Sequence, residues 1–227
     1  MAERTAETVQ SRLEVVRGRL AVAAPDPARV SIVAVTKGFG PEAVEAAVAA
    51  GLADIGENYA DELEAKAAGA PEGVRWHFLG APQRNKLGRL APLVCLWHGL
   101  DSEPAALALG RRRPGASVLV QVNLAPGAGR RGVQPGDAEG LVRAASFAGL
   151  EVRGLMAVAR PGADRPELAE GFRSVAVAAG RLGLAELSMG MSDDYEVAVA
   201  EGATIVRLGR ALFGERPEMT RGGIPPR

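Results

Sequence analysis

At 227 residues, with 47% hydrophobic and 24% charged residues, the chain has the composition of a globular protein with a sizeable core, which excludes disorder throughout. Its 27 basic and 27 acidic residues cancel, so no global field attracts nucleic acid or an anionic membrane. The acidic start lacks the apolar core of a signal peptide, and no apolar run is long enough to span a membrane. We therefore expect a cytoplasmic protein without nucleic-acid or membrane partners.

A helix is predicted before Pro25, within residues 1–24. Its apolar residues recur at spacings of four and three, which places them on one face. These residues are Val9, Leu13, Val16 and Leu20. An extra N-terminal helix therefore precedes the first strand.

Short apolar runs recur along the rest of the chain and predict eight strands. They lie at Ser31–Val35, Ala53–Ile55, Val74–Leu79, Leu93–Leu96, Ser117–Val122, Val152–Val158, Ala185–Ser188 and Thr204–Leu208. Helical patterns separate them, the clearest being formed by Leu168, Phe172, Val175, Ala179 and Leu182. Strands that alternate with helices pair in parallel through right-handed crossovers, and eight such units close naturally into a barrel.

The sequence thus predicts the α/β class, with a (β/α)8 TIM barrel over residues 30–217 and the extra N-terminal helix. We expect one domain over residues 1–217 and a disordered tail at residues 218–227. An open doubly wound sheet is the main alternative fold.

Three segments have more than one interpretation. Cys95 lies in a predicted buried strand, and no basic neighbour or helix start stands beside it, so we expect a packed, unreactive thiol. The three arginines at residues 111–113 suit the end of a helix, whose dipole they satisfy, better than a nucleic-acid site. Residues 123–136 are rich in glycine, proline and arginine and predict a long loop after a strand.

In a barrel of this type, an active site is built at the C-terminal ends of the strands. The first strand delivers Lys37, which is either simply solvated or, with a lowered pKa, able to form an imine. The second delivers Asn58, although this residue or Glu57 could instead cap the next helix. The third delivers His77, which stands between two aromatic residues and could be a hydrogen-bonded core residue instead.

The loops after the seventh and eighth strands commonly hold phosphate in such barrels. Residues 188–194 offer a hydroxyl and backbone amides to an anion, and residues 207–214 begin with arginine, leucine, glycine and arginine. The candidate residues are Met189, Ser192, Arg207, Gly209 and Arg210. A plain strand-to-helix turn explains either segment alone, but their joint appearance favours a phosphate cradle.

An amine on the first strand and a phosphate cradle on the last two suit a ligand that carries an aldehyde and a phosphate. Pyridoxal 5′-phosphate carries both. No acid is evident beside Arg207 to protonate the pyridine nitrogen, and an arginine there would weaken the ring as an electron sink. The sequence therefore predicts pyridoxal phosphate as the cofactor, with no metal site and no dedicated catalytic residue.

Several motifs recur in the order found in one known family. They are Ala34–Lys37, Gly56–Tyr59, Trp76–Gly80 with Gln83, Asn85 and Lys86, Gln121–Asn123, Gly154–Met156, Leu187–Ser192 and Val206–Gly209. Over residues 30–216 the chain resembles the pyridoxal phosphate homeostasis proteins of the YggS and PROSC type, which look like the isolated barrel domain of bacterial alanine racemase.

This resemblance implies roles for individual residues. Lys37 would be the Schiff-base lysine, and Ser192 and the amides near Gly209 and Arg210 would bind phosphate. Arg207 would face the ring or its phosphate. By the same resemblance, Asn58 would lie near the ring hydroxyl.

Two positions depart from the family pattern. Phe39 stands where the family often has another lysine, and Arg130 or Arg131 stands where a lysine usually follows the segment Gln121–Asn123. The pattern for a second cofactor site that uses those lysines is therefore incomplete.

Three functions are compatible with these observations. The leading one is a monomeric carrier that buffers, protects or delivers pyridoxal phosphate to apo-enzymes without turnover of its own. The alternative is an amino-acid racemase, which needs a second base opposite Lys37; Tyr59 and Tyr195 are available, but both lie at predicted helix starts. A third is a barrel in which Lys37 serves a sugar phosphate.

Overall fold

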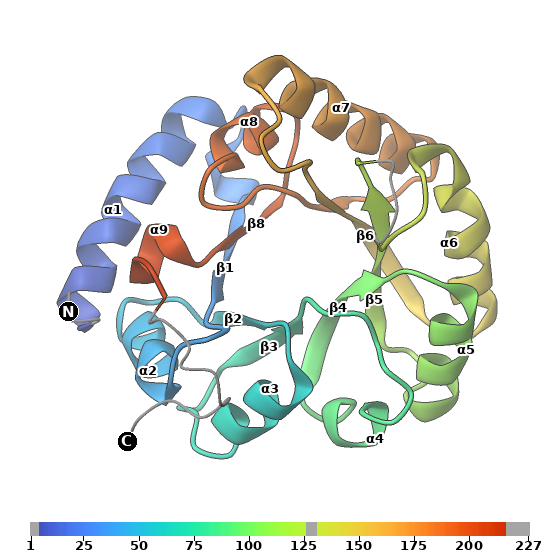
Figure 1. The fold of residues 1–227 in the computed structure, drawn as a ribbon, viewed down its shortest axis with the longest axis horizontal. Coiled ribbons are helices and arrows are strands. Elements are labelled where there is room, and N and C mark those ends of the chain that lie inside the picture. Colours follow the sequence, from blue (N-terminus) through green and yellow to red (C-terminus); the bar gives the residue numbers. More distant parts are fainter. Residues whose placement is uncertain (1–4, 126–130, 217–227) are drawn as a thin grey trace.

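Eight parallel strands close into a barrel in which each strand pairs with its neighbours in chain order. The computed structural model describes residues 5–125 and 131–216, and Figure 1 looks down the barrel with the helices around it. The strands are β1 (Ser31–Val35), β2 (Asp54–Glu57), β3 (Arg75–Phe78), β4 (Val94–Leu100), β5 (Ser117–Asn123), β6 (Glu151–Val158), β7 (Glu186–Ser188) and β8 (Ile205–Leu208). Because β1 pairs with both β2 and β8, the predicted (β/α)8 barrel is confirmed and the open sheet is ruled out.

The predicted N-terminal helix is α1, which packs against α2, α8 and α9. The side chain of Thr5 caps it by accepting a hydrogen bond from the amide of Thr8, and Ala24 ends it. The helices are α1 (Ala6–Ala23), α2 (Pro41–Ala49), α3 (Ala60–Ala67), α4 (Leu87–Leu90), α5 (Glu103–Arg112), α6 (Ala138–Phe147), α7 (Arg165–Arg181), α8 (Tyr195–Ala200) and α9 (Arg210–Phe213), with short 3₁₀ turns at Pro27–Arg29 and Pro135–Asp137. In Figure 1 α1 lies outside the barrel on the side of β1 and β8.

The hydrophobic core has two layers. The larger one lies between the sheet and the helices and includes Leu13, Ile55, Trp97 and Phe172. The smaller one consists of Val33, Leu96, Leu119, Met156 and Ile205. Because these five side chains come from strands that are not all neighbours, they meet across the lumen of the barrel. The rest of the lumen holds polar side chains, which form the site described below.

Strand β4 differs most from its prediction, because it extends to Leu100 rather than ending at Leu96. The extension contains His98 and Gly99, which interrupt the apolar pattern on which the prediction depended. Its consequence is that His98 lies fully buried inside the barrel.

The prediction that Cys95 is packed in the core is wrong, because this thiol is exposed. Trp76 pairs with Val94 and His77 pairs with Leu96, so Cys95 is the extra residue of a β-bulge at the start of β4. A continuous apolar run does not reveal a bulge, and at this bulge the thiol is exposed.

Other predictions are confirmed or lie outside the described residues. Residues 111–113 form the last turn and C-cap of α5, as expected. The predicted tail at residues 218–227 is not among the described residues, and the single-domain organisation over residues 1–217 stays a prediction. Within residues 5–125 and 131–216, no helix is both long and apolar enough to cross a membrane.

Gly154 on β6 offers a test of barrel packing. A Cβ at this position would lie 1.8 Å from the carbonyl oxygen of Glu186 on β7, which is backbone and cannot move cheaply. We expect Gly154→Ala to lower the free energy of unfolding by about 3 kcal/mol or more, measured by urea denaturation. Gly180→Ala, in α7 where no atom lies within 4 Å of the new Cβ, should instead raise it by about 0.5–1 kcal/mol. Equal effects of the two substitutions would contradict this packing.

Candidate functional site

Lys37 follows β1 and stands at the carboxyl end of the barrel, the end where the loops after the strands lie. The chain turns immediately after it: the amide of Phe39 donates to the carbonyl of Thr36 at 3.0 Å, and Gly38 has a φ of 73°. Only glycine adopts this left-handed conformation without strain. The amide of Gly38 also donates to Glu62 at 2.8 Å, so the turn that carries Lys37 is tied to α3.

A buried ion pair holds the end of β1 from the outer side of the barrel wall. The amine of Lys66 contacts Oε1 of Glu57 at 2.5 Å and the carbonyl of Thr36 at 2.8 Å. The hydroxyl of Thr36 donates to the same Glu57 oxygen at 2.6 Å. Burial raises the pKa of Glu57, although Lys66 and Thr36 oppose the shift. Glu57 therefore fixes the residue before Lys37, and neither it nor Asn58 caps α3, whose N-cap is Tyr59.

The electrostatic surroundings of Lys37 favour a neutral amine. Burial lowers the pKa of Lys37, and the nearby positive charges of Arg216 and Arg207 lower it further. Glu57 and Glu62 act in the opposite direction. A lysine with a lowered pKa is a better nucleophile at neutral pH, because more of it is unprotonated.

The loops after β7 and β8 are joined directly to each other. The hydroxyl of Ser192 accepts a hydrogen bond from the amide of Ala211 at 3.0 Å, and Arg210 pairs with Asp193. Asp194 closes its own loop by accepting from the amide of Met191 at 2.5 Å. The two segments that the sequence singled out thus form one structure beside β1.

Arg207 is a buried cation inside the barrel, with only 5% of its surface exposed. Its Nη1 donates to the carbonyl and the hydroxyl of Ser188, at 2.6 and 2.7 Å, and its Nη2 donates to the carbonyl of Ala157 at 2.8 Å. Burial lowers its pKa to about 10, although Asp194 opposes the shift. The guanidinium therefore stays charged at neutral pH.

A line of polar side chains continues from Ser188 through the lumen toward the amino end of the barrel. Nδ1 of His98 lies 2.9 Å from the hydroxyl of Ser188, and Nε2 of His98 lies 2.9 Å from Nδ1 of His77. Nε2 of His77 lies 2.9 Å from Asp54, which Arg75 contacts through two nitrogens. Five side chains from four strands (β2, β3, β4 and β7) therefore connect Arg207 with the opposite end of the barrel.

The pKa values of the side chains along this line differ from those of free histidine and aspartate. Burial disfavours charge on His77, but its hydrogen bond with Asp54 and its interaction with Cys95 outweigh burial and raise its pKa to about 9. Burial opposes ionisation of Asp54, yet His77 and Arg75 lower its pKa to about 2. Burial and the charges of His77 and Arg207 lower the pKa of His98 well below its ordinary value. At neutral pH His77 is therefore a cation and His98 is neutral.

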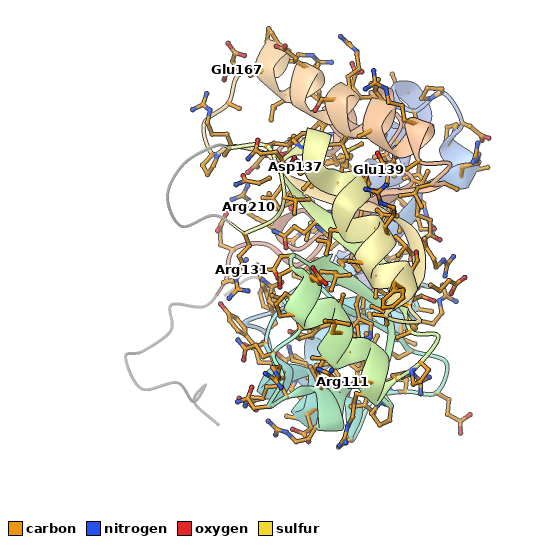
Figure 2. The ribbon with its side chains drawn as sticks, turned by 90° about the vertical axis from the view of Figure 1, so that its right-hand side faces the viewer. Arg111, Arg131, Asp137, Glu139, Glu167 and Arg210 are labelled. Carbon is orange, nitrogen blue, oxygen red and sulfur yellow. The ribbon has the colours of Figure 1, made fainter. Side chains whose placement is uncertain are left out.

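The structure brings most of the predicted site residues to one end of the barrel. Ala34 pairs with Leu208, so Gly209 follows β8 beside the end of β1 that carries Lys37. Asn58 is half-buried directly after β2, at the same end. Figure 2 shows Arg210 and Arg131 at one end of the barrel.

Three predicted site residues have other principal contacts. The side chain of Met189 is fully buried in the core between the sheet and the helices, so only its backbone faces the loop region. The guanidinium of Arg210 is exposed and pairs with Asp193, which leaves its amide as the group for an anion. His77 uses both ring nitrogens inside the lumen, and it reaches Arg207 only through His98 and Ser188.

Sequence reasoning missed His98, Asp54 and Lys66. Asp54 and Lys66 carried no motif, and the pairing of Lys66 with Glu57 depends on α3 folding back over β2. His98 lies 21 residues after His77, on the neighbouring strand. The recurrence of a Trp-His dipeptide at residues 76–77 and 97–98 was a usable signal for this pair.

The pair of Asp54 and His77 predicts a pH dependence of stability. The folded pKa of His77 is about 9, above its ordinary value of 6.5, so its stabilising effect is complete below pH 6.5 and is lost as pH rises through about 9. The loss amounts to about 3 kcal/mol at most. We expect Asp54→Asn to remove this fall in the free energy of unfolding, measured by urea denaturation across the range.

A matched control is Asp26→Asn, which removes an exposed carboxylate and should leave the pH dependence as in the wild type. If the wild type and Asp54→Asn lost stability in parallel above pH 6.5, the raised pKa of His77 would be disproved.

Comparison with known proteins agrees with this architecture. Residues 10–217 match the family model of the alanine racemase N-terminal domain. A pyridoxal phosphate homeostasis protein from Pseudomonas aeruginosa is 39% identical over 221 residues, which cover 93% of this chain and 95% of that protein. One from Deinococcus radiodurans is 44% identical over 188 residues, covering 81% and 88%.

The solved structures include PipY of Synechococcus elongatus with PLP bound. It is 33% identical to this chain with a TM-score of 0.80, and the match covers 91% of this chain and all of PipY, 100%. The identities and the coverage of both partners are high enough to assign the family. This chain belongs to the alanine racemase N-terminal domain family and, within it, to the pyridoxal phosphate homeostasis proteins.

Proposed function

We propose that this chain binds pyridoxal phosphate reversibly through Lys37 and serves as a carrier of the cofactor rather than as an enzyme with its own substrate. The observation that carries the proposal is the amine of Lys37, whose pKa burial and two arginines lower, at the end of the barrel where the β7 and β8 loops meet. The PLP-bound structure of PipY, which shares the fold and a third of the sequence, supports the same cofactor here.

The residues present suit this cofactor. When bound, pyridoxal phosphate supplies an aldehyde that a neutral lysine amine attacks reversibly. We assign the amine to Lys37, and the phosphate contacts to the hydroxyl of Ser192 and the amides of Gly209 and Arg210. Asn58 is assigned to the ring hydroxyl. The net positive character that Lys37 experiences from two arginines favours an anionic ligand.

Arg207 argues for carriage over catalysis. A guanidinium only donates hydrogen bonds, so an arginine that faces the pyridine nitrogen leaves that nitrogen unprotonated and the ring a weak electron sink. Asp194 is the acid whose charge acts on Arg207, but one of its oxygens accepts from the amide of Met191. A protonated pyridine ring, which broad carbanion chemistry requires, therefore has no evident support among the described residues.

The racemase alternative lacks a second base in the described residues. Tyr59 is 59% exposed at the start of α3. Tyr195 is buried, and its hydroxyl interacts with Arg19 of α1, which lies in the outer layer rather than at the carboxyl end of the barrel. We therefore rank racemisation, and with it the sugar-phosphate reading of Lys37, below carriage.

We propose a single cofactor site per chain. Phe39, where the family often has a second lysine, is buried and packs against Phe213 with ring centroids 5.5 Å apart. Arg131 pairs with Asp101 at 2.9 Å, and Arg130 lies outside the described residues. The expected monomeric state, the cytoplasmic location and the delivery to apo-enzymes belong to the same proposal.

The absorbance spectrum of the protein mixed with pyridoxal phosphate tests the role of Lys37. The chain has three lysines, and the other two are held by carboxylates, Lys66 by Glu57 and Lys86 by Asp61. We expect a visible band that borohydride bleaches in the wild type and in Lys86→Ala. Lys37→Ala should lack this band because the amines of the other two lysines are engaged by carboxylates.

Mass spectrometry of the reduced protein gives the stoichiometry, for which we expect one cofactor on a peptide containing Lys37. A wild type without the band in excess cofactor would overturn cofactor binding and favour another phosphate ligand. A wild type with the band that also turned over one amino acid at rates typical of enzymes would overturn carriage alone.

A further inference from the structure

The polar line through the lumen runs from solvent to the cofactor side of the barrel. At the amino end, Arg75 is 60% exposed and Asp54 is 15% exposed as side chains. A cavity of about 610 Å³, lined by Arg17, Ser31, Asp54 and Arg75 among others, opens there. At the other end the line stops on Arg207, which acts electrostatically on Lys37. Solvent at one end of the barrel is therefore linked by hydrogen bonds to a cation at the other.

The direction of these hydrogen bonds is determined by the protonation of His77. As a cation, His77 donates from Nε2 to Asp54 and from Nδ1 to Nε2 of His98. His98 must then carry its own proton on Nδ1 and donate it to the hydroxyl of Ser188. That hydroxyl accepts from both His98 and Arg207, which uses its two lone pairs.

We propose that His98 is a positioning residue for Arg207, and that the line Asp54–His77–His98–Ser188 transmits the protonation state of the amino end of the barrel to the cofactor site. The proposal deepens the proposed function, on which it rests for the role of Arg207 at the cofactor ring.

Loss of a proton from His77 exchanges donor and acceptor in each hydrogen bond from His77 to Ser188. The carboxylate of Asp54 can only accept, so the proton that leaves is the one on Nδ1 of His77. Nδ1 then accepts from Nε2 of His98, and Nδ1 of His98 accepts from the hydroxyl of Ser188. A hydroxyl that donates is a better acceptor for Arg207. His98 thus changes tautomer without changing charge, and the hydrogen bond on Arg207 changes with it.

The groups that face His77 decide where this reversal occurs. They are Asp54 on β2, Cys95 and His98 on β4, and Glu186 on β7, with Arg75 behind Asp54. The acids and the thiol favour the cation, whereas burial opposes it. Arg207 in turn faces Asp194, and its charge acts on Lys37 and His98. The reversal is expected near pH 9, where His77 loses its charge.

The chain has only two histidines, so the reversal is directly observable. The ¹⁵N shifts of protein labelled at the histidine rings, recorded without cofactor across a pH titration, report the protonation of all four nitrogens. We expect His98 to change from the Nδ1–H to the Nε2–H tautomer in the same step in which His77 becomes neutral. In Asp54→Asn this common step should move to lower pH. A His98 tautomer that stayed constant while His77 titrated would overturn the relay.

Two substitutions at His98 separate positioning from transmission. His98→Leu removes the donor to Ser188 and should weaken pyridoxal phosphate binding about tenfold, because Arg207 loses an oriented partner. His98→Gln keeps a donor but cannot ionise or change tautomer, so it should bind nearly as the wild type does. In both variants, the absorbance change of the bound cofactor that accompanies the titration of His77 should be absent.

The outcomes distinguish this inference from the proposed function. If the wild type bound no cofactor, the proposed function would fail while the tautomer titration still tested the relay. If the wild type bound the cofactor and both variants matched its affinity and its pH-dependent spectrum, only the present inference would fail. If His98→Leu does not fold, His98→Gln and Asp54→Asn test the same point. A bound-cofactor spectrum that titrates as in the wild type in both variants would contradict transmission of the His77 protonation state to the cofactor site.

Discussion

The burial of Arg207 inside a closed barrel is the constraint on which the polar architecture depends. A charge removed from water must be paired or fully hydrogen-bonded, and no carboxylate contacts this guanidinium among the recorded hydrogen bonds and ion pairs of the described residues. The carbonyls of Ser188 and Ala157 and the hydroxyl of Ser188 take its protons instead. The hydroxyl of Ser188 is in turn hydrogen-bonded to the imidazole of His98, and His98 to that of His77. Polar side chains in the lumen therefore form one connected hydrogen-bond network.

A second buried charge system acts from outside the barrel wall. Lys66 and Glu57 pair beneath the turn that follows β1 and hold the backbone of Thr36, so that Lys37 enters the site from a fixed position. The charges of Arg216 and Arg207 lower the pKa of Lys37 against the opposing charges of Glu57 and Glu62. The same field that lowers the pKa of an amine also attracts an anionic ligand. The two arginines therefore favour both reactivity and affinity at Lys37, while burial is the largest cause of its lowered pKa.

These two systems support the proposal that the site holds a cofactor rather than using it for catalysis. Enzymes that use pyridoxal phosphate broadly need a protonated ring nitrogen and a base placed opposite the lysine. Here the group that we propose for the ring side, Arg207, only donates hydrogen bonds, and Tyr59 and Tyr195 lie at the start of α3 and against Arg19 of α1. Under the proposed function, capture by Lys37 needs only its lowered pKa and the phosphate contacts assigned to Ser192, Gly209 and Arg210.

The sequence by itself determined the fold and which motif residues lie at its carboxyl end. The alternation of strands and helices predicted all eight strands, because hydrophobic periodicity is local, and the motifs around Lys37, Ser192 and Gly209 predicted the residues at the carboxyl end of the barrel. Only the tertiary structure decided the rest. The bulge that exposes Cys95 depends on the register between β3 and β4, and the line from Asp54 to Arg207 joins residues up to 153 positions apart. Hydrogen bonds across a barrel lumen depend on which strands face one another after closure. Apart from the repeated Trp-His dipeptide, no local pattern in the chain carries that information.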